Sequence, residues 1–363
     1  MTRSNLKLKY LSFLVSVSIS EPDFEMITID LIIHTLKNIF LNPYLAILVP
    51  VILKANIYSV SDIELILSQI YAILVVVYQI IQYVSDKSGP TRLDSQRDVA
   101  VVTGGSSGLG YNVAFLLASK GVKIAVLDAK APDIPVALVK YYKCDVGSYD
   151  DVAKSMAQVE SDLGPVTILV NNAGVERRGS LWEMPVEDIQ LTINVNLLSQ
   201  FYTLRCVLPG MIAANRGYIV SVGSSLSYTS PIYYGPYGAS KAGLLGLYET
   251  LRVELEQYPG IQTLLVLPGQ MRTPMFQDIY PPRQFLAPVV EPRDLATEIV
   301  DKIAHGKSGE IRRPIYVHGM PYLRILPWPI QRALRWISNL DGSVIAASNA
   351  AMAASSTGSL DNT

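Results

Sequence analysis

The stretch TGGSSGLG, residues 103–110, decides the fold because it lies where a short apolar run gives way to a helical pattern. Two interpretations of this stretch predict unrelated chemistry. Residues 104–108 match the G-x-S-x-G elbow that exposes a nucleophilic serine in hydrolases. The glycines at 104, 108 and 110 match instead a loop whose following helix N-terminus binds the phosphates of a dinucleotide.

Residues further along the chain favour the dinucleotide loop. The next apolar run ends in Asp128, close to the offset of about 20 residues at which a carboxylate binds an adenosine ribose. A nucleophile elbow needs an acid and then a histidine later in the chain. His305 and His318 are the histidines that follow, and both lie in terminal segments without the pattern of a catalytic loop. The candidate cofactor-binding residues here are Gly104, Ser106, Ser107, Gly108, Leu109, Gly110 and Asp128.

From residue 98 onward, short apolar runs alternate with helical patterns. This alternation predicts an α/β fold with a doubly wound parallel sheet over residues 91–320. The expected strands cover residues 98–102, 123–128, 139–146, 166–174, 217–225 and 261–269, with a strand-like run at 311–319. The expected helices cover residues 108–120, 148–163, 187–214, 237–258 and 293–305.

The first 90 residues are expected to form a hydrophobic membrane-anchoring region. Residues 65–84 carry no charge and are long enough to cross a bilayer as a helix. Residues 38–53 are also uncharged but shorter, and Pro43 and Pro50 favour a re-entrant or interfacial segment. A buried helix of an N-terminal subdomain is the alternative. The basic residues that follow residue 84 favour a cytosolic position for the rest of the chain.

The C-terminal segments are expected to behave differently from each other. Residues 321–340 are apolar with three arginines spaced along them, which suits docking on a membrane surface, covering of a pocket, or packing as a terminal helix. Residues 341–363 are rich in Ala, Ser, Gly and Asn and are expected to be disordered.

Composition excludes several classes of function. The net charge is −1, so the chain has no excess of basic residues that would indicate binding to nucleic acid. Two cysteines and three histidines without ligand-like spacing predict neither a disulfide framework nor a metal site.

Four motifs in a fixed order now identify a resemblance. TGGSSGLG at 103–110, NNAG at 171–174, YGASK at 237–241 and PGQMRT at 268–273 resemble the short-chain dehydrogenase/reductase family over residues 98–316. The hydrophobic N-terminus and LPWPIQRALRW at 326–336 are similar to its membrane-anchored branch, which includes lipid-droplet hydroxysteroid and retinol dehydrogenases.

The resemblance implies an oxidoreductase that transfers a hydride between NAD(H) or NADP(H) and a lipophilic alcohol, ketone or aldehyde, such as a retinoid, a steroid or another lipid. It also implies association with the endoplasmic reticulum or a lipid droplet and suggests pairing into a homodimer. The bias of basic residues favours a catalytic domain that faces the cytosol. The loop at 277–290 favours a lipophilic substrate, as do three tyrosines near the site, namely Tyr228, Tyr233 and Tyr234. A non-catalytic dinucleotide-binding membrane scaffold is the alternative.

Tyr237 and Lys241 are the central candidates for catalysis. Residues four apart share one face of a helix, so the ammonium lies beside the phenol and stabilises the phenolate. The resemblance implies that Tyr237 is the acid/base and that Lys241 activates it and binds the nicotinamide ribose. It further implies that Ser224 orients the substrate oxygen, with Ser225 as the alternative. Asn196 would hold a water in the proton relay, with Asn194 as the alternative.

The expected cofactor is NAD, because a carboxylate at Asp128 repels a 2′-phosphate. Lys130 lies nearby and keeps NADP as the alternative. The resemblance implies further cofactor contacts at three sites in the chain. Adenine would contact Asp145 and Val146, the fourth strand would contribute Asn172, Ala173 and Gly174, and the nicotinamide carboxamide would be held by Pro268, Gly269 and Thr273.

Overall fold

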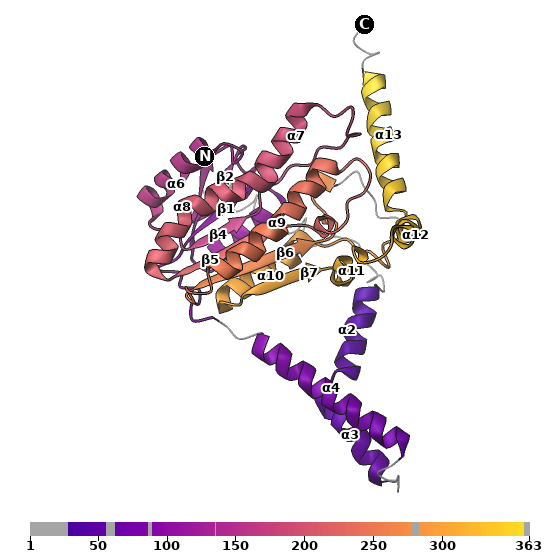
Figure 1. The fold of residues 1–363 in the computed structure, drawn as a ribbon. Coiled ribbons are helices and arrows are strands. Elements are labelled where there is room, and N and C mark those ends of the chain that lie inside the picture. The colour runs from indigo at the N-terminus through magenta and orange to yellow at the C-terminus, as the bar shows by residue number, and fades with distance from the viewer. Residues whose placement is uncertain (1–27, 56–61, 86–88, 135, 277–282, 359–363) are drawn as a thin grey trace, which may run out of the picture.

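The structure is a computed structural model that describes residues 28–55, 62–85, 89–134, 136–276 and 283–358. Its centre is a parallel sheet of seven strands in the order β3-β2-β1-β4-β5-β6-β7 (Figure 1). The strands are β1 Val99–Thr103, β2 Lys123–Asp128, β3 Val139–Lys143, β4 Ile168–Asn171, β5 Gly217–Val222, β6 Ile261–Pro268 and β7 Gly309–Arg313. The predicted doubly wound α/β fold is therefore confirmed.

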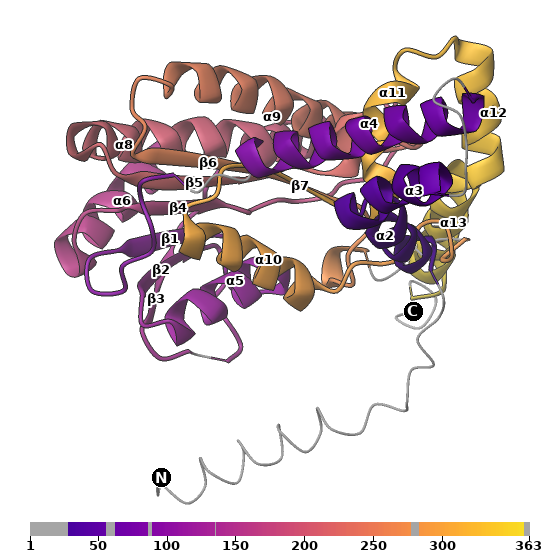
Figure 2. The same cartoon turned by 90° about the horizontal axis from the view of Figure 1, so that it is seen from below.

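Helices cover both faces of this sheet (Figure 2). Buried side chains of α5 Gly108–Ser119 and α10 Pro292–His305 pack against one face. The other face is covered by α6 Tyr149–Leu163, α8 Ser199–Ala214 and α9 Gly235–Glu254. The strand order reverses between β1 and β4, and such a switch point opens a crevice at the carboxyl ends of the strands.

Two elements differ from the sequence expectation in ways that affect the site. The helix expected over 187–214 is divided into α7 Val186–Ile193, a π-helical turn at Asn194–Leu198, and α8. The strand expected over 311–319 ends at Arg313, since Pro314 has no N–H with which to extend the ladder. A 3-10 turn, η4 Ile315–His318, follows it.

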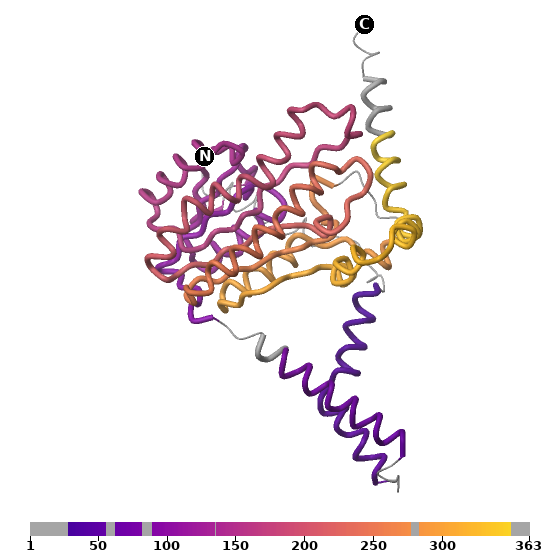
Figure 3. The backbone as a smooth tube through the Cα atoms, in the orientation of Figure 1, coloured from indigo at the N-terminus to yellow at the C-terminus, as the bar shows by residue number. Residues whose placement is uncertain are grey.

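The N-terminal segment forms three helices outside the sheet, namely α2 Ile29–Phe40, α3 Pro43–Ala55 and α4 Ile63–Ser85 (Figure 3). Helix α4 is long and apolar enough to cross a membrane over Ile63–Ile81, and α2 and α3 form a pair bent by 50°. Ala46 of α3 packs between the helices against Ala72 and Val75 of α4. Most of the large apolar side chains on α3 and α4 are exposed. Residues 1–27 of the expected anchoring region lie outside the described residues.

The C-terminal segment is more ordered than the sequence suggested. Helices α11 Met320–Leu323 and α12 Trp328–Ser338 are followed by α13 Leu340–Gly358. The expectation of a disordered tail is wrong for residues 341–358, which are helical. Alanine favours helix, and Val344 becomes buried against Tyr234 and Tyr237 of the α/β domain. Residues 359–363 of the expected tail lie outside the described residues.

Candidate active site

The loop between β1 and α5 needs glycine at two positions for steric reasons. Gly104 has a φ of +63° and Gly108 a φ of +57°, a backbone region that side chains disfavour. A Cβ atom on Gly104 would lie 2.7 Å from the Cα of Ala173. The side chain of Ser107, the N-cap of α5, makes no capping hydrogen bond. The first N–H groups of α5 have no acceptor within the helix and are therefore available to an anion.

The loop is braced by the end of β4. The Thr103 hydroxyl accepts hydrogen bonds from the backbone N–H groups of Asn172 and Ala173, at 3.0 and 3.1 Å. The side-chain amide of Asn172 donates to the carbonyls of Thr103 and Gly104, at 3.1 and 2.9 Å. Asn172 thus fixes the loop, and Thr103 is a structural residue that the sequence analysis did not single out.

Asp128 lies at the end of β2 with its carboxylate held in place. One oxygen accepts from the N–H of Ser106 at 3.0 Å, and the other from the N–H of Lys130 at 3.2 Å. The hydroxyl of Ser106 donates to the Lys130 carbonyl at 2.6 Å. Ser106 therefore links the loop to the end of β2, while Asp128 lines the adjoining cavity.

A cavity of about 930 Å³ connects the loop with the start of α9. Most of the candidate residues from the sequence line it. They are Gly104, Ser107, Gly108, Leu109, Asp128, Asp145, Val146, Asn172, Ala173, Gly174, Ser224, Tyr237, Lys241, Pro268, Gly269 and Thr273. Ser106, Gly110 and Asn196 do not line it. Glycine is needed at 110 because a Cβ atom there would collide with the Gly104 carbonyl.

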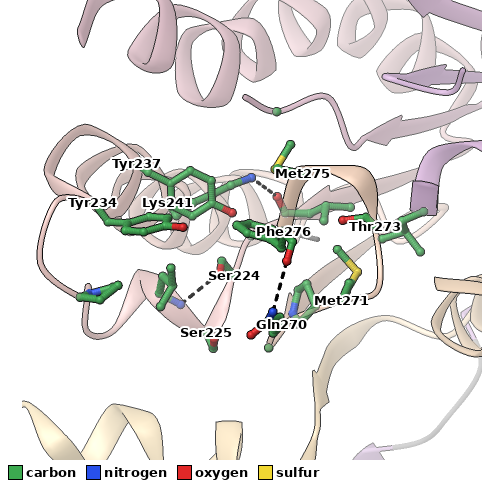
Figure 4. Close-up of a pocket in the computed structure, with 18 of the residues that line it drawn as sticks. Ser224, Ser225, Tyr234, Tyr237, Lys241, Gln270, Met271, Thr273, Met275 and Phe276 are labelled. Atoms are coloured by element: carbon green, nitrogen blue, oxygen red, sulfur yellow. Dashed lines mark hydrogen bonds between the residues drawn. The ribbon is translucent and has the colours of Figure 1, made fainter. Parts of the chain in front are cut away.

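The geometry distinguishes the two serine candidates after β5. The Ser224 hydroxyl lies near enough to the phenol of Tyr237 to lower its pKa, whereas the Ser225 hydroxyl acts in this way on Tyr316. Figure 4 shows Ser224 on the side of Tyr237 and Ser225 on the far side of the backbone. The Ser224 oxygen also accepts from the N–H of Leu226 at 3.1 Å, which fixes its direction. The structure therefore places Ser224, and not Ser225, beside the phenol.

Lys241 is buried with its ammonium against the end of β5. Its Nζ donates to the carbonyl of Val222 at 2.9 Å and lies 5.8 Å from the centroid of the Tyr237 ring. Burial lowers the pKa of Lys241 to about 8. Burial raises the pKa of Tyr237 to about 12, against the lowering effect of the Ser224 hydrogen bond, and the Glu176 carboxylate raises it further. At neutral pH the phenol therefore carries its proton.

Asn196 is fully buried in the π-helical turn, and its side chain is occupied by protein partners. Its Oδ1 accepts from the N–H of Val175 at 2.7 Å. Its Nδ2 donates to the Val175 carbonyl at 2.9 Å and to Ser240 at 3.2 Å. A Cβ atom on Gly174 would lie 3.4 Å from this Oδ1 and 3.8 Å from Lys241 Nζ. The Asn196 side chain thus holds the end of β4 against α9 instead of lining the cavity.

The rings of Tyr234 and Phe276 meet the Tyr237 ring edge to face, with centroids 5.8 and 6.3 Å away. Tyr234 is one of the three tyrosines expected near the site, whereas Phe276 and several other residues around the phenol were not found from the sequence. Met271, Met275 and residues of α11 to α13 complete this end of the cavity. No spacing rule could identify most of these residues, whereas the amphipathic pattern at 321–340 already allowed a pocket cover.

Comparison with known proteins agrees with this geometry. The family model for short chain dehydrogenases matches residues 98–284. The uncharacterized oxidoreductase YDL114W of Saccharomyces cerevisiae is 31% identical over 68% of this chain and 83% of its own length. Human estradiol 17-beta-dehydrogenase 11 is 29% identical over 63% of this chain and 79% of its own length.

A solved structure has the same fold. Aldohexose dehydrogenase of Thermoplasma acidophilum superposes with a TM-score of 0.56 and 22% identity, covering 64% of this chain and 97% of that one. At this sequence identity the structural similarity supports a shared fold and nothing more. With the family match and the motifs assembled around one cavity, the conclusion is that the chain belongs to the short-chain dehydrogenase family of oxidoreductases.

Proposed function

We propose that this protein is a membrane-attached dehydrogenase/reductase that transfers a hydride between NAD(H) and a lipophilic alcohol or its carbonyl product. The observation that carries the proposal is the placement of Tyr237, Ser224 and Lys241 at one end of a cavity whose other end is a glycine loop. A nicotinamide dinucleotide, when bound, supplies or accepts the hydride.

The residues present fit such a cofactor. Two glycines with positive φ and the open N-terminus of α5 form a cradle that a Cβ atom on Gly104 would obstruct. Asp128 would bind the adenosine ribose, and its charge would disfavour a 2′-phosphate, so NAD is the proposed cofactor and NADP the alternative. The remaining cofactor contacts would come from Asp145, Val146, Asn172, Ala173, Gly174, Lys241, Pro268, Gly269 and Thr273.

In this proposal the protein's own side chains transfer a proton to or from the substrate oxygen. Ser224 and Tyr237 would hold the substrate oxygen by hydrogen bonds, which fixes the carbon that exchanges the hydride. In carbonyl reduction Tyr237, which its raised pKa keeps protonated at neutral pH, donates its proton to that oxygen. In alcohol oxidation the phenolate accepts the proton, and the ammonium of Lys241 stabilises the phenolate charge. Asn196 would act as a positioning residue that keeps α9 in place.

A lipophilic substrate is supported by the cavity wall near Tyr237. Phe276, Met275 and Leu323 line that end, and the wall of the whole cavity is more apolar than polar. The name of the human relative specifies estradiol, a steroid. Attachment through α3 and α4 to the endoplasmic reticulum or a lipid droplet, with the α/β domain in the cytosol, agrees with the apolar surface of those helices.

The test uses the full chain reconstituted in phosphatidylcholine vesicles. NADH and NADPH binding are followed by nicotinamide fluorescence, and turnover is followed with long-chain alcohols, a retinoid and a steroid. We expect NADH to bind more tightly than NADPH and at least one lipophilic alcohol to be oxidised. Turnover of small water-soluble ketones alone would contradict the proposed substrate class. Tight cofactor binding without any turnover would favour the membrane scaffold instead.

A further inference from the structure

Helix α12 exposes both of its tryptophans to solvent, while two of its polar side chains face the protein. Arg335 faces the protein, where its guanidinium lies 2.7 Å from the Asp341 carboxylate, and Gln331 lines the cavity. Trp328 and Trp336, in contrast, are 63% and 81% exposed. A helix that turns Gln331 and Arg335 inward and two tryptophans outward is not arranged to face water alone.

We call the exposed residues Tyr322, Ile325, Trp328, Arg332 and Trp336 the aromatic face. Tyr322 and Ile325 are 68% and 78% exposed, and the last three residues are four apart on one side of α12. Tryptophan and tyrosine concentrate at the boundary between lipid and water. Arg332 adds a positive charge to this face, which complements anionic lipid headgroups, whereas Arg324 and Arg335 are bonded within the protein.

The aromatic face lies on the side of the domain from which the N-terminal helices leave. Helix α2 starts beside two segments that line the cavity: the Ile29 N–H donates to the Phe285 carbonyl at 3.1 Å, and the Ile315 N–H donates to Asp30 at 2.9 Å. From there α2 leads to the α3–α4 pair. Figure 1 shows α12 nearly end-on, whereas α4 runs along the picture, below α12 and apart from it. A surface that α4 enters would therefore meet α12 along its length.

The cavity reaches this same surface. Leu334 and Ile337 of α12 line the cavity and are still 39% and 45% exposed, so they belong to its rim. We propose that the aromatic face lies in the interface of the membrane that α4 enters, and that substrate reaches the cavity from the lipid past this rim. The inference rests on the proposed membrane attachment and deepens the proposed function.

Tryptophan fluorescence tests the position of the aromatic face directly, because the chain has three tryptophans. The full chain is reconstituted in phosphatidylcholine–phosphatidylserine vesicles with and without brominated acyl chains. In the Trp182→Phe variant, which retains Trp328 and Trp336, we expect strong quenching by bromine. The control is the Trp328→Phe/Trp336→Phe variant, which retains Trp182 in the segment between β4 and α7, and we expect quenching several-fold weaker. Equal quenching of the two variants, or none in the first, would overturn the proposal.

A kinetic comparison tests the entry route. We expect Trp328→Ala/Trp336→Ala to raise the KM for a long-chain alcohol embedded in vesicles by about tenfold and to leave kcat/KM for a short water-soluble alcohol unchanged. An equal effect on both substrates would contradict entry from the lipid.

If the wild type oxidises neither alcohol, the proposed function fails, while the quenching result still decides where the aromatic face lies. Quenching that is absent, together with dimers on sedimentation, would assign the face to a second copy of the chain.

Discussion

The ammonium of Lys241 donates a 2.9 Å hydrogen bond to the carbonyl of Val222, the last residue of β5. This contact anchors the lysine on α9 to the carboxyl edge of the sheet and holds its charge beside the ring of Tyr237. The arrangement puts a charged group where burial disfavours it, which lowers the pKa of Lys241 to about 8. The buried ammonium therefore lowers the stability of the folded state, a cost that is common at catalytic sites.

Replacement of Lys241 by methionine should therefore stabilise the protein at pH 7 while lowering kcat by about 100-fold or more. The folded pKa of about 8 lies below the usual 10.5, so below pH 8 both folded and unfolded states are charged and the folded state carries the cost of burial. That cost disappears as pH rises from 8 to 10.5, and the wild type gains stability over this window. The gain from Met should be of the order of 2 kcal/mol at pH 7, allowing for the unpaired Val222 carbonyl.

Thermal unfolding of both proteins in one detergent, at pH 7 and at pH 10, measures this effect. The advantage of the methionine variant should shrink at the higher pH. A variant less stable than the wild type at pH 7 would show that burial of the ammonium carries no cost.

Asp128→Asn should shift cofactor preference from NADH toward NADPH. The carboxylate accepts from the N–H groups of Ser106 and Lys130, and an amide oxygen retains one acceptor while removing the charge that repels a 2′-phosphate. The ratio of kcat/KM for NADPH to that for NADH should rise by at least about tenfold. Asp133→Asn, an exposed change a few residues away, is the control and should leave the ratio unaltered. An unchanged ratio in Asp128→Asn would separate this residue from cofactor choice.

Gly104→Ala should weaken NADH binding and destabilise the fold by about 1–3 kcal/mol, because φ is +63° and the new Cβ would lie 2.7 Å from the Ala173 Cα. Gly246→Ala is the matched control. Gly246 is exposed on α9, and no atom lies within 4 Å of the place that its new methyl group would take, so this change should stabilise by about 0.5–1 kcal/mol. Denaturation curves and NADH titration compare the two. Similar behaviour of both variants would contradict the steric account of the loop.

Val344→Ala should raise the KM for a lipophilic substrate without changing NADH affinity. Val344 is 1% exposed and packs against Tyr234 and Tyr237, so the lost methyl groups open space at the substrate end of the cavity. Ile345→Ala, next in sequence on α13 and 36% exposed, is the control and should leave KM unaltered. A rise in KM shared by both variants would indicate a general effect on α13.

The part of the site that was predictable from the sequence is the part made by strand ends. Parallel strands bring their carboxyl ends to one edge, so motifs after β1, β2, β4, β5 and β6 had to converge there. The loop glycines, Asp128 and Tyr237 were therefore identifiable from their place in the strand pattern. Spacing also placed Lys241, because residues four apart share a helix face.

The remaining features depend on side-chain direction and on packing between distant segments. Ser224 and Ser225 are adjacent in sequence, and only the backbone course after β5 shows which one meets the phenol. Asn196 lies in a π-helical turn that no apolar periodicity signals, and its side chain bonds to Val175 instead of reaching the cavity. The burial of Val344 depends on contact with α9, which the composition of an Ala- and Ser-rich tail does not show.

The central claim, that Tyr237 is the proton-transfer group of an oxidoreductase, is tested most directly by Tyr237→Phe. Tyr248→Phe is the matched control, since Tyr248 lies on the same helix and its hydroxyl donates to the Gly309 carbonyl at 2.8 Å, away from the cavity. Both variants are compared with the wild type for NADH binding and for kcat on the best lipophilic alcohol. We predict that Tyr237→Phe binds NADH normally and loses at least about 100-fold in kcat, while Tyr248→Phe retains its activity. Wild-type turnover by Tyr237→Phe would contradict the claim.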